Sequence, residues 1–361
     1  MAKKRKTLVE NFQEIIDSGD LSAFRTVFDK CEITAVNGRG KTTCNAFSFK
    51  GLIPAHIQFL IDQGLDPNAD CGFGRTAVYF QAYSLENLQC LIQNGADVNL
   101  TLSNLTGNAL FCTVTGGGHG SNGESVTCVK NLLSCGAKVT GRFGLMKETI
   151  LENLLSGCMN AYIINALAIA RLLLNAGAPK TPEIKEFVHR IGERFEFYRA
   201  DFNKECVNEF SDALMELYKL FDVEPVPQRV VYDGRSPIAV TSKTWQEQHD
   251  ELWDLLVPGR GPADTVQGEV IRIIGKVNHE ILDNGAINWD ADYKKLPLAM
   301  ADYFKLADGL EASLVNEACA LAKRVSANSS QAMLYRLNEL TVRWVLANPN
   351  PIKLQKVDYE R

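Results

Sequence analysis

Four segments of the chain repeat one pattern of apolar and polar positions. They read QFLIDQGLDPN at 58–68, QCLIQNGADVN at 89–99, KNLLSCGAKVT at 130–140 and RLLLNAGAPKT at 171–181. Each has an apolar run followed by a glycine, which predicts the end of a helix because glycine readily adopts the left-handed conformation found there. A phrase that recurs roughly every 30 to 40 residues indicates a repeat array.

The second half of the chain has a different pattern, in which apolar residues recur at helical spacing without a repeated phrase. We expect a helical cap at 183–222, a linker at 223–243, a helical C-terminal domain at 244–347 and a tail at 348–361. Within the domain, Thr265 and Asp290 are predicted to cap helices. The stripe that begins at Val266 and Val270 predicts a helix packed on one side. The fold class is therefore expected to be all-α.

The repeated phrase resembles the second helix and the ending of the ankyrin repeat, LLxxGAdvN. The family's preceding phrase, G-x-T-P-L-H, is matched in part, with Thr42, Thr76, Ala109 and Thr149 at the threonine position, but its Pro and His are absent. The resemblance covers 8–182 as about five degenerate repeats, with insertions near 115–125 and 156–163. It implies an ankyrin-type α-solenoid followed by the helical C-terminal domain.

The resemblance also implies a binding surface made of loop tips and first helices, which suits burial against another protein. Aromatic residues and arginine tend to dominate the energy of such interfaces. Carried onto this sequence, the partner-binding positions are Arg39, Lys41, Phe49, Lys50, Phe73, Arg75, Tyr83, Leu105 and Asn108.

One cluster of polar residues in the second half raises a chemical question. It consists of Gln267, Glu269, Arg272, His279, Asn288 and Asp290. Converging carboxylates and a histidine could form a metal or acid–base site, or a polar binding patch. The stronger interpretation is structural, because Glu269 and Arg272 have the spacing of an ordinary ion pair on an exposed helix face.

Composition narrows the alternatives. The net charge of −5 disfavours a nucleic-acid partner, and no apolar run approaches the roughly 18 residues of a membrane span. The basic residues near the start predict a disordered tail at 1–7. Ten cysteines without a CxxC pair favour reduced thiols in a cytoplasmic protein rather than zinc ligands. The glycine-rich stretches at 38–42 and 118–123 match nucleotide-binding motifs only in part, so no cofactor or metal is expected.

These observations favour a non-catalytic protein–protein interaction module that acts as an adaptor, inhibitor or effector in the cytoplasm. The alternative is an enzyme whose active site lies in the helical C-terminal domain, with the repeats recruiting its substrate. A third interpretation is self-association into a homo-oligomer through the C-terminal helices. The sequence does not name the partner.

Overall fold

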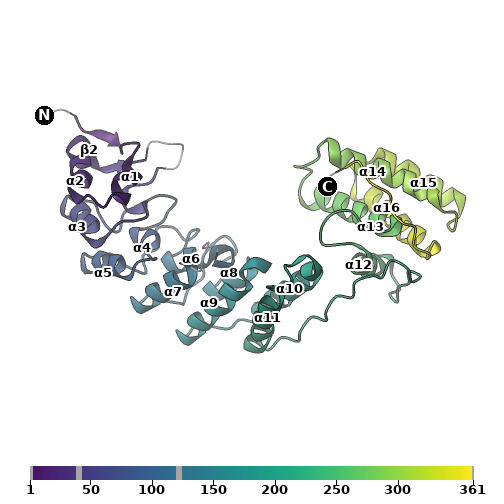
Figure 1. Cartoon of the computed structure of the whole chain (residues 1–361), viewed down its shortest axis with the longest axis horizontal. Coiled ribbons are helices and arrows are strands. Elements are labelled where there is room, and N and C mark those ends of the chain that lie inside the picture. Colours follow the sequence, from purple (N-terminus) through teal and green to yellow (C-terminus); the bar gives the residue numbers. More distant parts are fainter. Residues whose placement is uncertain (1–2, 38–42, 119–123, 360–361) are drawn as a thin grey trace. The chain divides into compact units, whose positions relative to one another are not determined.

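The computed structural model describes residues 3–37, 43–118 and 124–359. Two compact units divide the chain: unit 1 comprises Met1–Glu193 and Lys204–Val226, and unit 2 comprises Arg194–Asn203 and Pro227–Arg361. The described residues are mostly helical (Figure 1), which is the class that the sequence predicts. None of their helices is long and apolar enough to cross a membrane.

Unit 1 begins with a small sheet packed beside two helices. Strand β1 (Arg5–Thr7) pairs in parallel with β2 (Cys31–Val36), and α1 (Phe12–Asp17) and α2 (Leu21–Lys30) lie between them in the chain. The prediction of a disordered tail at 1–7 is therefore wrong for residues 5–7. The backbone groups of this segment find partners in β2, an element 24 or more residues away that the local composition does not reveal.

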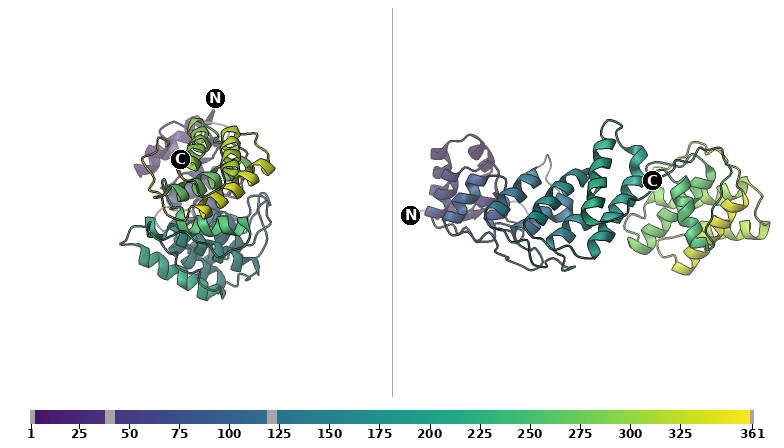
Figure 2. Two further views of the ribbon diagram at one scale, coloured as in Figure 1. Left: turned by 90° about the vertical axis from the view of Figure 1, so that its right-hand side faces the viewer. Right: turned by 90° about the horizontal axis from the view of Figure 1, so that it is seen from below.

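After this sheet, unit 1 continues as two rows of helices (Figures 1 and 2). One row contains η1 (Ala46–Ser48), α4 (Ala77–Phe80), α6 (Ala109–Gly118) and α8 (Ile150–Ser156). The other contains α3 (Pro54–Asp62), α5 (Leu85–Gln93), α7 (Glu124–Ser134) and α9 (Ile163–Asn175), with the short η3 (Asn160–Tyr162) before α9. Each helix contacts the next member of its row, so the apolar runs of successive repeats share one core.

The four predicted closing glycines have the expected geometry. Their φ angles are 95°, 92°, 86° and 89° at Gly64, Gly95, Gly136 and Gly177. The residue after each glycine donates its N–H to a leucine carbonyl of the preceding helix, as Leu65 does to Leu60 at 3.0 Å. A side chain at this φ would be strained, so the glycines are required by the backbone itself.

Asparagine side chains link the endings of successive repeats. Asn68 donates to the Gly95 carbonyl at 2.8 Å and accepts from the Asp97 N–H at 2.8 Å. Asn99 makes the same two bonds with Gly136 and Lys138, at 3.1 and 2.7 Å. The third repeat has Thr140 at this position, and the residue that would donate is Pro179, which has no N–H. We call the bonds of Asn68 and Asn99 the asparagine ladder.

The first helix of each repeat begins at a capping residue, and two of these differ from the predicted alignment. The N-cap residues are Asn45, Thr76 and Thr149, and the Asn108 side chain accepts a hydrogen bond from the Phe111 N–H at the start of α6. The predicted equivalents Thr42 and Ala109 are thus out of register in the first and third repeats. The alignment on threonine fails in these two repeats because asparagine caps a helix as well as threonine does.

Two further helices complete the first half of the chain. Helix α10 (Glu183–Tyr198) is followed by η4 (Arg199–Asp201) and α11 (Val207–Phe221), and α11 packs on α9. A Cβ atom at Gly192 of α10 would lie only 1.7 Å from the hydroxyl oxygen of Tyr218 in α11. Glycine therefore permits the close approach of these two helices. Residues 194–203 belong to unit 2, so the compact units divide the predicted cap.

Unit 2 surrounds one central helix, α13 (Val266–Asn278), which continues as a π-helical turn at His279–Asp283. Around it lie α12 (Trp245–Leu256), α14 (Ala291–Tyr303), α15 (Ala312–Arg324) and α16 (Gln331–Ala347), with the short η6 (Phe304–Leu306) after α14. The predicted caps Thr265 and Asp290 are confirmed. The prediction that α13 packs on one side only is wrong, because every residue from Val266 to Ile274 is buried.

Candidate functional site

A row of exposed apolar side chains lies on the turns that precede the first helices of unit 1. Phe73, Leu105 and Met146 each stand three residues before an N-cap residue, and their exposed fractions are 56%, 62% and 83%. Leu145, next to Met146, is 85% exposed. Contiguous exposed apolar residues are unusual on a protein surface and mark interaction sites. We call these four residues the apolar tip row.

Hydrogen bonds hold the three turns side by side. The Thr106 hydroxyl donates to the Gly74 carbonyl at 3.2 Å, which joins the first turn to the second. The Gly144 N–H donates to the Asn104 carbonyl at 2.9 Å, which joins the second to the third. Each bonded residue is a chain neighbour of a member of the apolar tip row. The row is therefore one surface rather than three separate exposures.

Phe73 adopts a backbone conformation that a bulky residue rarely takes. Its φ is 59°, and it stands between Gly72 and Gly74, whose φ angles are 124° and 67°. A non-glycine residue in this region is strained, and such strain is concentrated at functional sites. The turn is closed by the Cys71 N–H, which donates to the Arg75 carbonyl at 2.8 Å. An exposed aromatic ring is thus held at a fixed place at an energetic cost.

A cavity of about 510 Å³ adjoins this first turn, lined by residues of η1, α4, α6 and α7. We call it the Arg75 cavity. Three of the predicted partner-binding residues, Lys50, Arg75 and Tyr83, line it together. The guanidinium of Arg75 lies over the ring of Tyr79, with Cζ 4.5 Å from the ring centroid. Lys50 pairs with Glu124 at 3.0 Å, and both side chains are at least half exposed.

Tyr83 is committed to the fold. Its hydroxyl accepts from the Gly51 N–H at 3.0 Å and donates to Gln81 Oε1 at 3.1 Å. Gln81 is fully buried and donates to the carbonyls of Phe47 and Phe49 at 2.7 and 3.0 Å. Burial raises the pKa of Tyr83, so this hydroxyl stays protonated. It contributes a fixed wall to the cavity rather than a free ligand group.

The other predicted partner-binding residues have mixed outcomes. Arg39 and Lys41 lie outside the described residues. The Phe49 ring packs edge-on against Phe12 of the core, with ring centroids 4.9 Å apart. The placement of Asn108 at the binding surface is wrong, since it is 3% exposed and its side chain caps α6. Its polar side chain satisfies a helix N–H that would otherwise lack a partner.

Sequence reasoning missed Leu145 and Met146. Met146 stands in the third turn at the same distance from the cap Thr149 as Phe73 stands from Thr76, and Leu145 is the residue before it. Lys147 takes a positive φ of 52° in this turn, where glycine would be usual, so the similarity of the two turns is not evident from the sequence. Counting back from the caps, rather than forward from the glycines, would have found Met146 and, next to it, Leu145.

In unit 2 the predicted polar cluster is divided between the core and the surface. Glu269 and Arg272 are 0% and 1% exposed, so their placement on an exposed helix face is wrong. Arg272 donates to both Glu269 oxygens, at 2.8 and 2.6 Å, and the Tyr359 hydroxyl donates to Glu269 Oε1 at 2.8 Å. The Ala263 N–H completes the shell of the carboxylate at 2.8 Å. Such a saturated ion pair is a structural element.

Gln267 holds the C-terminal segment against α13. Its amide donates to the carbonyls of Asn348 and Asn350, and its oxygen accepts from the Ile352 N–H at 3.0 Å. Residues after 347, expected as a tail, thus pack in unit 2 as far as Tyr359, which is 4% exposed. The expected linker behaves similarly, because the buried Ile238 donates its N–H to the Pro349 carbonyl at 2.8 Å.

The remaining members of the polar cluster lie apart from this network. The His279 side chain is 72% exposed and faces Asp283 at 3.2 Å. The backbone and side-chain nitrogens of Asn288 donate to Glu280, and Asp290 caps α14. In the described part of the chain, no group of three or more His, Cys, Asp or Glu side chains is placed to hold a metal ion.

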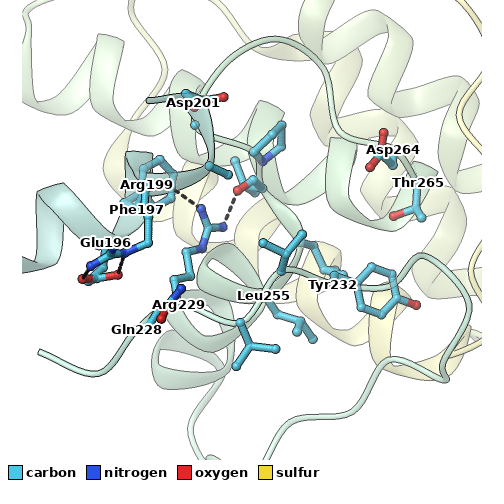
Figure 3. A pocket seen from close by; sticks show the side chains of 17 residues that line it. Glu196, Phe197, Arg199, Asp201, Gln228, Arg229, Tyr232, Leu255, Asp264 and Thr265 are labelled. Atoms are coloured by element: carbon cyan, nitrogen blue, oxygen red, sulfur yellow. Dashed lines mark hydrogen bonds and ion pairs between the residues drawn. The ribbon is translucent and has the colours of Figure 1, made fainter. Parts of the chain in front are cut away.

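A second cavity, of about 230 Å³, lies within unit 2 (Figure 3). One of its two arginines, Arg229, stacks on Phe197 at 4.3 Å and donates to the carbonyls of Phe197, Asp254, Trp253 and Val257. Three of these carbonyls belong to the end of α12, where a cation is favourable. Burial lowers the pKa of Arg229, although Asp254 and Asp201 act against the shift. Neither Glu269 nor His279 lines this cavity.

None of the ten cysteines forms a disulfide bond. Burial raises the pKa of Cys71 to about 12 and that of Cys128 to about 11, so both remain protonated near neutral pH. Protonated thiols are poor nucleophiles and poor metal ligands. Cys128 therefore presents a neutral, weakly polar wall to the Arg75 cavity.

Comparison with known proteins adds no identification. No protein-family model matches this chain, and no curated protein has a significantly similar sequence.

Proposed function

We propose that unit 1 is an ankyrin-type array of helix pairs and that the chain is a non-catalytic binding module for a protein partner, acting as an adaptor, inhibitor or effector. The partner segment lies along the apolar tip row. The observation that carries this proposal is the exposure of Phe73, Leu105 and Met146 at one repeated offset from three helix caps.

The array interpretation is supported by the closing glycines, the asparagine ladder and the two rows of helices, which are related from one repeat to the next. In such an array each unit contacts only its neighbours, so the turns on one edge form an extended surface. Apolar side chains on that edge gain free energy by leaving water against a partner, in the range of about 1.5–3 kcal/mol for each fully buried side chain.

The strained Phe73 is the expected anchor. A rigid aromatic ring loses little conformational freedom on binding and buries a large area. Arg75, two residues later, adds a cation beside it. Aromatic and arginine side chains at the centre of an interface are those whose removal most reduces affinity.

The test is affinity capture from the native cell with the full-length chain. A triple variant, Phe73→Ala with Leu105→Ala and Met146→Ala, should reduce partner recovery at least about tenfold while the thermal unfolding midpoint stays close to the parent value, because the three side chains are exposed. The matched control changes three exposed apolar residues of unit 2, Ile287→Ala with Leu298→Ala and Leu306→Ala.

Recovery lost in the first variant and retained in the control supports the proposal. Equal recovery by both variants, or loss in the control alone, would place the partner elsewhere and contradict it. A single variant, Phe73→Gly, separates the anchor from the backbone, since glycine accepts a φ of 59° without strain. It should keep the fold and still weaken capture.

A further inference from the structure

Among the described residues, Arg75 has no carboxylate partner, although its guanidinium lies over Tyr79 and its side chain hydrogen-bonds Cys112. Its Nε atom is buried and has no hydrogen-bond partner, and the described residues form no ion pair with its guanidinium. Arg229 in unit 2 provides the contrast, since carbonyl groups accept from all three of its nitrogens. A buried donor without an acceptor is unfavourable. Arg75 therefore lies at the wall of a cavity with its charge unpaired and one donor unsatisfied.

The segments of unit 1 that lie outside the described residues cannot supply a carboxylate to Arg75. Those segments, 1–2, 38–42 and 119–123, contain no Asp or Glu in their sequences. The acid that lines the same cavity, Glu124, is paired with Lys50 at 3.0 Å. The charge of Arg75 is thus not balanced by an acid of its own unit.

Two of the polar groups beside Arg75, on Tyr79 and Cys112, are neutral. Burial raises the pKa of Tyr79 against the opposing effect of Arg75, so the phenol keeps its proton. Burial likewise raises the pKa of Cys112, against the charge of Arg75 and a hydrogen bond between the two side chains. The Cys112 thiol donates to the Thr106 carbonyl at 2.9 Å. Among the described residues the Tyr79 hydroxyl makes no hydrogen bond, and Tyr79 lines the cavity beside the guanidinium. An incoming anion would meet a cation and a phenol donor.

We propose that the Arg75 cavity receives the carboxylate side chain of an Asp or Glu residue in the partner segment that lies on the apolar tip row. This inference rests on the proposed function and specifies the partner's chemistry: an apolar residue against Phe73, with an acidic residue close to it in the chain. The turn at 71–75 fixes both contacts, because Phe73 and Arg75 belong to one hydrogen-bonded loop.

A carboxylate fits this cavity better than a phosphate group. One unpaired guanidinium matches a single negative charge and can bind it in a bidentate manner. A phosphate group carries nearly two charges at neutral pH. The second cation at the cavity, Lys50, is already paired with Glu124, whose carboxylate would repel a dianion.

The experiment selects dodecapeptides from a phage-displayed random library on the full-length protein. Selected peptides should carry Asp or Glu at a fixed distance from an apolar residue. One of them is then synthesised with a fluorescent label, together with versions in which the acid is replaced by Gln or phosphoserine. Affinities are measured by fluorescence polarisation for the parent, Arg75→Gln, Arg75→Lys and Phe73→Gly proteins.

We expect Arg75→Gln and the peptide Gln replacement each to weaken binding by about tenfold or more, and to weaken it no further when combined, because both remove the same ion pair. Arg75→Lys, which keeps the charge but loses the bidentate geometry, should lie between the parent and Arg75→Gln. It also serves as the test variant if circular dichroism shows that Arg75→Gln does not fold.

The inference would be overturned if Arg75→Gln and the peptide Gln replacement weakened binding additively. It would also be overturned if the selected peptides carried no Asp or Glu at a fixed position. If selected peptides without a fixed acid bind the Phe73→Gly protein more weakly than the parent, the proposed function stands and only the proposed acidic contact is wrong. Tighter binding of the phosphoserine peptide than of its parent would replace carboxylate with phosphate. A library that yields no binder counts against both proposals.

Discussion

The two units differ in how far apart along the chain their hydrogen-bonded side chains and partners lie. In unit 1 the asparagine ladder joins residues 27 to 39 positions apart, always between neighbouring repeats. In unit 2 the bonds of Gln267 and Glu269 reach 81 to 90 positions, to the far end of the chain. Unit 1 is thus held by neighbour contacts that can be changed one at a time, whereas unit 2 depends on one central helix and on residues that arrive last in the sequence.

Arg75 of unit 1 and Arg229 of unit 2, which line different cavities, also differ in how far their donors are satisfied. Backbone carbonyls accept hydrogen bonds from Arg229, so its removal would leave the carbonyl groups at the end of α12 without a donor. Arg75 is stacked on Tyr79 and keeps donor capacity. A cavity with a saturated cation is part of the fold, and a cavity with an unsatisfied cation is a candidate for binding.

The largest expected effect comes from Glu269→Ala in unit 2. The change leaves Arg272 buried without its counter-charge, which typically costs about 3–5 kcal/mol. All four tryptophans, Trp245, Trp253, Trp289 and Trp344, lie in unit 2, so tryptophan fluorescence during urea unfolding reports on this unit alone. Its midpoint should fall sharply, while the part of the far-UV circular dichroism transition that belongs to unit 1 remains.

The matched control is Glu317→Ala, which breaks the more exposed pair with Arg336 and should change the free energy of unfolding by less than about 1 kcal/mol. Equal effects of the two changes would contradict the distinction between a buried and an exposed ion pair in this unit.

A smaller effect is expected from Asn99→Ala in unit 1. The variant loses the bonds to Gly136 and Lys138, which lie at the surface, so we expect a loss of about 1 kcal/mol. Thr140→Ala is the control, because the ladder does not extend to Pro179. The measurement is the urea midpoint by far-UV circular dichroism. Comparable losses in the two variants would show that the ladder adds no stability.

The smallest effect concerns pH and two histidines, of which His56 is buried and His249 partly buried. Burial lowers the pKa of His56 in unit 1 below its usual 6.5, and burial lowers that of His249 in unit 2, with Asp250 opposing the shift. A depressed folded-state pKa means that stability is present above about 6.5 and declines as the pH falls through the folded value. Both units should lose stability between pH 7.5 and 5.5.

In His56→Gln the decline of unit 1 should flatten, while the fluorescence transition of unit 2 keeps its pH dependence. A unit 1 midpoint that falls as steeply in His56→Gln as in the parent would mean that another group is responsible. The comparison of circular dichroism with fluorescence assigns each change to its unit, since unit 1 contains no tryptophan.

Features that depend on neighbouring residues could be predicted from the sequence. The closing glycines and the caps Thr265 and Asp290 follow from local backbone geometry, which the adjacent residues dictate. The register of the first helices could be predicted only in part. Asparagine and threonine cap helices equally well, so an alignment on threonine misplaces the start of the helix where the cap is Asn45 or Asn108.

The residues of the candidate site were also predictable from the sequence only in part. Phe73, Arg75 and Leu105 were predicted from the repeat pattern, and the structure places them on or beside connected turns. Met146 escaped because its turn uses Lys147 in place of glycine. Arg75 could be recognised as a surface cation, but the lack of an ion pair between it and any described carboxylate is a property of the folded chain.

The sequence by itself determined the helical class, the repeated phrase and the ends of its helices, because each depends on conformational preferences within a few residues. Only the tertiary structure decided which polar residues are buried. Glu269 and Arg272 have the same spacing whether the helix face meets water or protein, and Tyr359, some 90 positions later, is what closes that face. Burial is set by long-range packing, and a local pattern carries no record of it.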